Sequence, residues 1–148
     1  MRRSSKNCSP MTVERVVIDT SILISAALFG SGKPAAAVDY AVTHCTIIFS
    51  RPTFDELATR IMRQKFDRYV STTERQVYLD KMYATATWVE IPETLAVCRD
   101  PDDNKVLETA VSGRAECILT GDHDLRALDP FQGIPIVSAA QFLTLVGK

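Results

Sequence analysis

This sequence has little of the chemistry on which several common classes of protein depend. It contains two histidines, His44 and His123, neither beside an obvious nucleophile, and four cysteines with none in CxxC spacing. A zinc site or a disulfide framework is therefore not expected, and a reducing, cytoplasmic location is predicted. Glycine is scarce as well. The GSGKP stretch combines glycine with lysine but lacks the spacing of a phosphate loop, and we interpret it as a turn.

An excess of charge of one sign and long apolar runs are missing too. The formal net charge is -1, so any contact with a polyanion must be local or carried by metal ions. Residues 1–12 are polar and basic without the apolar core of a signal peptide, and we expect a flexible arm there. No apolar stretch is long enough to cross a membrane, so no membrane partner is expected. Residues 13–148 are predicted to form a single domain.

Short apolar runs alternate with amphipathic segments along the rest of the chain. Strands are expected at residues 13–18, 45–50, 117–120 and 134–138, with a further short one at WVEI. Helices are expected from SILISAALF, from near Pro34, after Ser50, from the STTE capping box, from RDPDDNK and over AAQFLTLV. This alternation predicts βαβ units, a parallel sheet and helices on both of its faces.

Four acidic residues follow the ends of these strands. Asp19 closes the first strand, Glu56 lies in the helix after the second, Asp103 lies early in a later helix, and Asp122 follows CILT after one glycine. Because the carboxyl ends of parallel strands share one edge, the topology brings these acids together. Clustered carboxylates repel one another, and hard cations such as magnesium or manganese relieve the repulsion. Such metals can activate water against a phosphodiester.

Three of the acids also have simpler interpretations. Asp19 can cap the helix that follows it, as aspartates often do. Glu56 lies beside the apolar stripe of its helix and can pair with Arg60 on the surface. In TGDHDL, either Asp122 or Asp124 can cap a short helix.

The RDPDDNK stretch is open to two interpretations. Asp100 is a good N-cap, and Asp102 and Asp103 can complement the helix dipole. Asp103, however, shares a helical stripe with apolar residues, namely Val106, Leu107 and Ala110. That position favours an inward carboxylate, which is costly when unpaired. We interpret Asp102 as a solvated acid.

The motifs VIDTSIL, RPTFDEL, RDPDDNKVLETA and TGDHDL, in this order, resemble those of the PIN-domain ribonucleases. The likeness is closest to the toxin components of bacterial toxin–antitoxin systems, and the KFDRY stretch resembles that subfamily too. It covers about Val13 to Gly147. The resemblance implies a three-layer α/β/α fold with a central, mostly parallel sheet. It also implies a magnesium- or manganese-dependent endoribonuclease that cuts single-stranded RNA, with a cognate antitoxin protein as partner.

The resemblance also implies roles for individual residues. The matching catalytic positions are Asp19, Glu56, Asp103 and Asp122, of which Asp19, Asp103 and Asp122 are the metal ligands. The supporting positions are Thr20, Ser21, Thr120 and Asp124. Ser21 departs from the asparagine of many members, although a hydroxyl there can still hold a water or a phosphate oxygen. Which of Asp122 and Asp124 reaches the metal stays open.

Basic residues surround the helix that carries the glutamate, namely Arg51, Arg60, Arg63, Lys65, Arg68 and Arg75. They form either a solvated face or a surface that holds an RNA backbone, which would make binding sensitive to salt. Arg51 and Arg60 are the candidates for RNA contact.

Other functions remain as alternatives. A phosphotransfer enzyme of the haloacid dehalogenase type would need a second aspartate where Ser21 stands, and a response-regulator receiver would need an acidic pair after the first strand. A non-catalytic metal- or RNA-binding module, and a stand-alone PIN nuclease without an antitoxin, would keep the same fold. A homodimer is compatible with all of these.

Overall fold

The computed structural model describes residues 12–92 and 101–148, without the side chains of residues 101–103. The arm expected at residues 1–12 therefore lies almost wholly outside the described residues, as does the cap expected at Asp100. Five strands form one parallel sheet in the order β3-β2-β1-β4-β5. They are β1 (Arg15–Ile18), β2 (Thr46–Phe49), β3 (Thr87–Trp88), β4 (Cys117–Leu119) and β5 (Ile136–Val137).

Every expected strand is present, and most are shorter than the apolar runs that predicted them. Ser50 and Ser138 leave their strands because their hydroxyls cap the helices that follow, each in a capping box. The parallel pairing places β2 and β4 on either side of β1. The three strands whose ends carry the predicted acids are therefore neighbours.

The helices connect the strands in the expected order. They are α1 (Thr20–Phe29), α2 (Gly32–His44), α3 (Arg51–Ile61), α4 (Thr72–Thr85), α5 (Pro101–Ser112), α6 (His123–Arg126) and α7 (Ala139–Leu145), with a short 3-10 turn, η2 (Gln64–Phe66), after α3. Gly30 ends α1 with a φ of 62°, and α2 begins before Pro34. Within the described ranges no single helix is long and apolar enough to cross a membrane, and α1 and α2 meet that test only as a pair bent by 104°.

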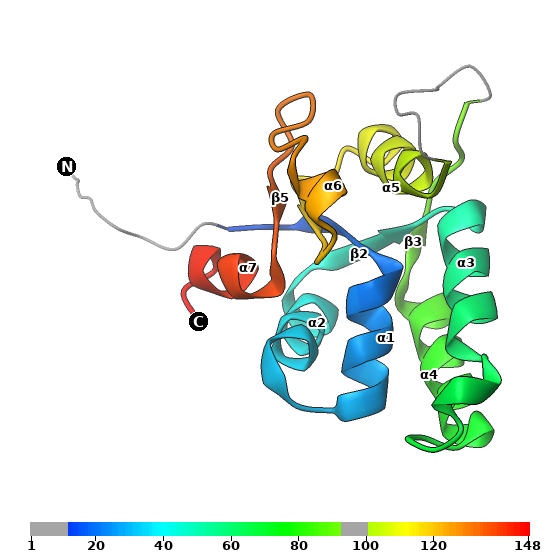
Figure 1. Ribbon diagram of the computed structural model, residues 1–148. Coiled ribbons are helices and arrows are strands. Elements are labelled where there is room, and N and C mark those ends of the chain that lie inside the picture. Colours follow the sequence, from blue (N-terminus) through cyan, green and yellow to red (C-terminus); the bar gives the residue numbers. More distant parts are fainter. Residues whose placement is uncertain (1–11, 93–100) are drawn as a thin grey trace.

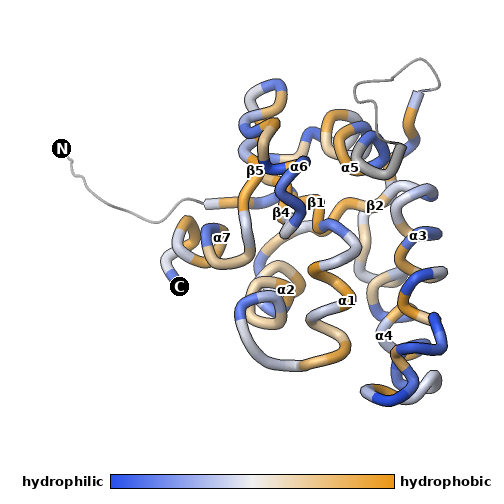
Figure 2. The backbone as a smooth tube through the Cα atoms, viewed as in Figure 1, coloured by the Kyte–Doolittle hydropathy of each residue, from blue (hydrophilic) through white to orange (hydrophobic). Residues whose placement is uncertain are grey.

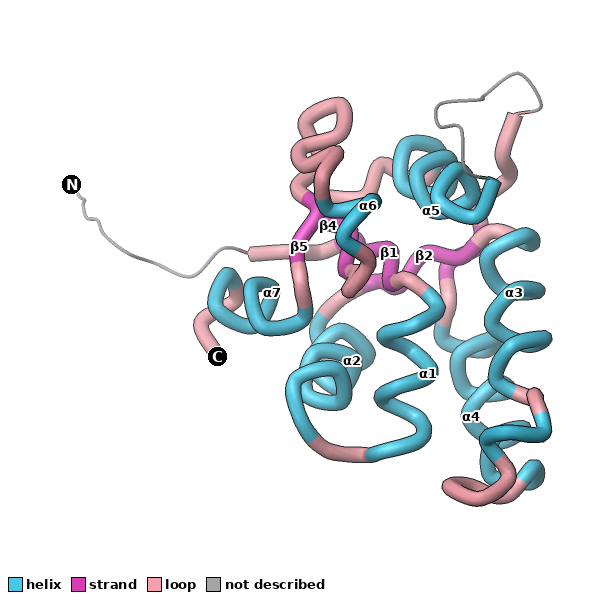
Figure 3. The backbone as a smooth tube through the Cα atoms, viewed as in Figure 1, coloured by secondary structure: helices cyan, strands magenta, loops and turns pink. Residues whose placement is uncertain are grey.

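Two apolar cores lie on opposite faces of the sheet. Val16 and Ile18 pack in one core, with side chains from α1, α2, α3, α4 and α7. Val17 faces the other core, which α5 and α6 cover. Figures 1 and 3 show the strands between these two groups of helices, and Figure 2 shows hydrophobic residues along the central strands. The predicted three-layer α/β/α sandwich is confirmed, and its inner strands are buried on both sides.

Candidate active site

The site begins where β1 ends, against the end of β4. The backbone N–H of Asp19 donates to the carbonyl of Leu119 at 2.8 Å, which extends the pairing of the two strands by one residue. Asp19 then leaves the sheet as the N-cap of α1, and its Oδ1 accepts a hydrogen bond from the Thr20 N–H at 2.8 Å. Asp19 is thus fixed at the carboxyl edge of the sheet by backbone contacts on both sides.

The second carboxylate oxygen of Asp19 is held by Thr120, directly after β4. Thr120 is fully buried and donates from its Oγ1 to Asp19 Oδ2 at 2.7 Å. Burial raises the pKa of Asp19, the two hydrogen bonds oppose that rise, and the charges of Glu56 and Asp122 add to it. Three of the four predicted acids therefore share one electrostatic neighbourhood.

Asp122 and Asp124 occupy different positions at this edge. The N–H of Asp122 donates to Thr120 Oγ1 at 3.0 Å, and its carboxylate caps α6 by accepting from the Asp124 N–H at 2.9 Å. The Asp122 charge acts on Asp19. The hydroxyl of Thr120 therefore contacts both the carboxylate of Asp19 and the backbone N–H of Asp122. The structure thus links Asp122 to Asp19 more directly than it links Asp124 to Asp19.

Glu56 is not the surface residue that helix periodicity indicated. Its side chain is only 8% exposed and pairs with Arg60 at 3.3 Å and with Lys105 at 3.5 Å. The pairing with Arg60 was predicted, whereas its burial was not. The reason is that periodicity locates the face of α3 that packs on the sheet, whereas Glu56 is covered from the side by α5, which carries Lys105.

A buried hydroxyl network fixes α3 against α5. Ser50 Oγ lies 2.7 Å from Thr109 Oγ1, and Ser50 and Thr53 form the capping box that begins α3. Thr109 also donates to the carbonyl of Lys105 at 2.6 Å. The network therefore sets the position of Lys105 relative to Glu56.

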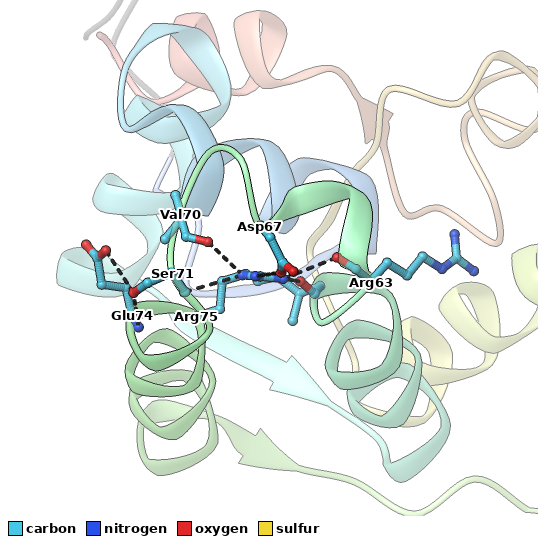
Figure 4. Close-up of polar contacts among 7 residues, drawn as sticks. Arg63, Asp67, Val70, Ser71, Glu74 and Arg75 are labelled. Carbon is cyan, nitrogen blue, oxygen red and sulfur yellow. Dashed lines mark hydrogen bonds and ion pairs between the residues drawn. The ribbon is translucent and has the colours of Figure 1, made fainter.

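Arg75 was grouped with the candidate RNA-binding residues, and this grouping is wrong. Its side chain is fully buried and donates to the carbonyl of Ile61 at 2.8 Å, with further bonds to the carbonyls of Arg63, Val70 and Ser71. It also pairs with Asp67. Figure 4 shows this cluster between α3 and α4. Arg75 builds the connector, which leaves the other basic residues for the surface.

Arg51 and Asp103 are the remaining candidates. Arg51 is exposed and pairs with Asp55 at 3.6 Å. Asp103 lies in the first turn of α5, before the buried Val106, Leu107 and Ala110, and its side chain lies outside the described residues. Among the acids, histidines and cysteines whose side chains are described, no three lie close enough to hold a metal ion. Asp19 and Asp122 offer only oxygen, which suits magnesium or manganese.

A groove of about 340 Å³ opens beside Asp19, between α1 and the end of α3. Sequence reasoning did not find it. Its walls are Thr20, Ser21, Ile24, Ser25, Leu28, Phe29, Arg60, Arg63, Phe66 and Tyr69. The available signal was the interleaving of aromatic and basic residues in KFDRY, of which only the basic residues were considered as a possible RNA surface.

Comparison with known proteins agrees with this architecture. The family model of the PIN domain matches residues 15–124. "Uncharacterized protein MJ1680" of Methanocaldococcus jannaschii is 30% identical over 116 residues, which are 77% of this chain and 74% of that protein.

Two crystal structures share the fold. One is VapBC2 from Rickettsia felis, bound to a DNA fragment from its promoter. It has a TM-score of 0.58 at 12% identity, and the match covers 84% of this chain and 98% of that one. PAE2754 from Pyrobaculum aerophilum has a TM-score of 0.56 at 21% identity, covering 93% and 92%. With a family model that spans most of the sheet and the acidic edge, the resemblance of the motifs is confirmed, and the chain belongs to the PIN domain family.

Proposed function

We propose that this chain is a divalent-metal-dependent endoribonuclease that cuts single-stranded RNA. The observation that carries the proposal is the carboxylate of Asp19, fixed by Thr20 and Thr120 and placed in the electrostatic field of Glu56 and Asp122. Membership of the PIN domain family, a family of nucleases, supports the same conclusion. Asp19, Glu56, Asp103 and Asp122 are proposed as the catalytic acids.

Asp19, Asp103 and Asp122 are the residues proposed to hold magnesium or manganese. An ionised carboxylate has about four lone-pair sites, and Asp19 uses one on each oxygen for its two hydrogen bonds. Sites therefore remain on both oxygens for a cation. A bound divalent ion would supply an activated water and would stabilise the charge on the phosphodiester. Thr120 would hold Asp19 and Asp122 in fixed positions relative to each other. Arg60 and Lys105 would balance the charge of Glu56.

The experiment is cleavage of a fluorescent single-stranded RNA by the purified chain with magnesium, with manganese and with EDTA. Asp19→Asn and Asp103→Asn should each lower the rate by orders of magnitude while circular dichroism stays unchanged, because asparagine keeps the size and shape of the aspartate side chain. Glu56→Gln has a matched control in Asp55→Asn, the next residue back on α3, whose side chain is exposed. The control should cut at the wild-type rate.

Comparing Asp122→Asn with Asp124→Asn decides which acid acts. Asp122→Asn should lower the rate more, because the charge of the Asp122 carboxylate acts on Asp19. Cleavage that survives EDTA, or an Asp19→Asn variant that cuts at the wild-type rate, would contradict the proposed function. Binding of RNA without cleavage in any metal would favour the non-catalytic module.

We propose further that the chain is the toxin of a toxin–antitoxin pair. The likeness of fold to VapBC2 supports this, together with an acidic edge at which a partner arginine or lysine could form charge-assisted hydrogen bonds. Co-expression with the product of the adjacent upstream gene should yield a complex, and expression of the chain alone should slow growth. Absence of both effects would favour a stand-alone nuclease. Light scattering would test the homodimer, and fractionation of the host would test the cytoplasmic location.

A further inference from the structure

The groove beside Asp19 has a chemical character that the catalytic acids do not require. It starts at Thr20 and Ser21 and ends at Phe29, the last residue of α1. At a rise of 1.5 Å per residue, the helix carries this groove about 14 Å from the acidic edge. Figure 1 shows α1 and α3 side by side, with the connector between α3 and α4 near the end of α1. The groove is therefore a track that leads away from the candidate catalytic centre.

Two aromatic rings stand exposed at the far end of the track. Phe29 is 57% exposed and Tyr69 is 52% exposed, and their rings meet edge to face with centroids 5.5 Å apart. The guanidinium of Arg68 lies over the Tyr69 ring at 5.5 Å. Both residues therefore stay more than half exposed although the two rings touch each other and Tyr69 also contacts Arg68. Exposed apolar rings cost free energy in water unless a ligand covers them.

The wall opposite α1 is basic. Arg60 of α3 and Arg63 line the groove, and Lys65 and Arg68 lie over the rings of two further lining residues, Phe66 and Tyr69. The one acid in that connector, Asp67, is paired with the buried Arg75. Figure 4 shows the side chain of Arg63 extending away from that cluster, and Figure 2 shows hydrophilic residues at the turn between α3 and α4. The wall thus combines positive charge with aromatic faces.

We propose that this groove binds the single-stranded RNA beside the scissile bond, with bases stacked on Phe29 and Tyr69 and phosphates held by Arg63, Lys65 and Arg68. The inference rests on the proposed function and names the segment of substrate that leaves the acidic edge. Basic grooves with aromatic platforms are how proteins hold single strands without reading a sequence. A base in a duplex has its faces covered by its neighbours and could not stack there.

An amphipathic peptide is the other ligand that an apolar groove can take. Two observations favour RNA. First, the groove is continuous with Thr20 and with Arg60, which pairs with Glu56, so any strand cut at the acidic edge must pass close to it. Second, Arg68 lies over the ring of Tyr69 and Lys65 over that of Phe66, so cationic and aromatic side chains stand together in the groove, as they do in proteins that hold single strands.

The test is equilibrium binding in EDTA, where no metal-dependent cleavage occurs. Fluorescence anisotropy of the full chain would be measured with a labelled single-stranded RNA of about eight nucleotides, the same RNA as a duplex, and an abasic oligonucleotide of equal length. Phe29→Ala and Tyr69→Ala should each weaken RNA binding about fivefold or more and leave binding of the abasic probe unchanged. Arg63→Ala should weaken both, because it removes a phosphate contact.

The matched controls are Tyr69→Phe, which keeps the ring, and Tyr83→Ala, which removes a ring of similar exposure on α4 outside the groove. Both should bind RNA like the wild type. Equal affinity for RNA and the abasic probe, or RNA affinity unaffected by Phe29→Ala and Tyr69→Ala, would overturn the inference. So would an acidic amphipathic helical peptide that binds the groove without displacing RNA. Because no cleavage is measured, loss of the proposed nuclease activity and failure of this groove would be seen separately.

Discussion

The contacts of Arg75 predict how much stability the protein loses when this residue is replaced. Replacing it by methionine keeps the apolar stem but removes the guanidinium, so the buried carbonyl of Ile61 loses its donor. A buried acceptor left without a partner costs about 1–3 kcal/mol. Asp67 also loses its partner, although its side chain is 51% exposed and water can replace much of that contact.

The expected loss is therefore about 2–4 kcal/mol, below the ~3–5 kcal/mol typical when one member of a fully buried pair is removed. Asp67→Asn should cost about 1 kcal/mol, because Arg75 keeps its carbonyl acceptors and the amide oxygen can still accept. Arg68→Met is the matched control, an exposed arginine on the same connector, and it should change stability by about 0.5 kcal/mol or less.

Urea unfolding followed by circular dichroism measures all three variants against the wild type. The order of the free energies of unfolding is the strictest test. Arg75→Met should be much less stable than Asp67→Asn, and Asp67→Asn should be less stable than Arg68→Met. If Arg75→Met lost no more stability than Arg68→Met, the carbonyls would have to be solvated in its absence. The account of Arg75 as the residue that builds the connector would then be wrong.

Two further predictions concern the edge of the sheet. Burial raises the pKa of Asp19, so the stabilising contribution of this group is complete below its ordinary pKa of 3.8 and is lost as the pH rises through its folded value. In metal-free buffer Asp19→Asn should therefore be more stable than the wild type at neutral pH, with the advantage shrinking as the pH falls toward 3.8; a constant difference across that range would contradict the burial argument. Ser50→Ala should cost about 2 kcal/mol and Ser138→Ala about 1 kcal/mol in thermal or urea unfolding, because both hydroxyls cap a helix but only Ser50 also holds the buried Thr109. Equal losses would show that the bond between Ser50 and Thr109 contributes little.

The sequence was sufficient for the order of the elements because each one carries its own local signal. Ser71 caps α4 where the STTE motif predicted it, and the β-branched runs form β1 and β2 within their predicted ranges, because such signals act over a few residues. The parallel sheet followed from the alternation of these elements, and its edge followed from the parallel direction of the strands. Strand ends were the weakest prediction, since a serine can finish a strand or begin a helix.

Side-chain environments were harder, because they depend on elements far apart in the sequence. Helix periodicity shows only which face of α3 packs on the sheet. Glu56 is covered by a second helix, α5, whose Lys105 lies far from Glu56 in the sequence. Arg75 was mistaken for a surface cation for a related reason. Nothing within α4 shows that the carbonyls at the end of α3 need a donor.

The two interpretations of Asp19 turn out not to compete. As a cap it uses Oδ1 for the first free N–H of α1, and as a member of the acidic edge it turns Oδ2 toward Thr120. Capping fixes the side chain by a local bond and Thr120 fixes it by a distant one, so the carboxylate has little freedom to turn away from the edge. A site that must hold several like charges needs that rigidity, because a mobile carboxylate would relieve the repulsion by moving apart from its neighbours. The cap is thus the means by which the sequence places the first acid of the site.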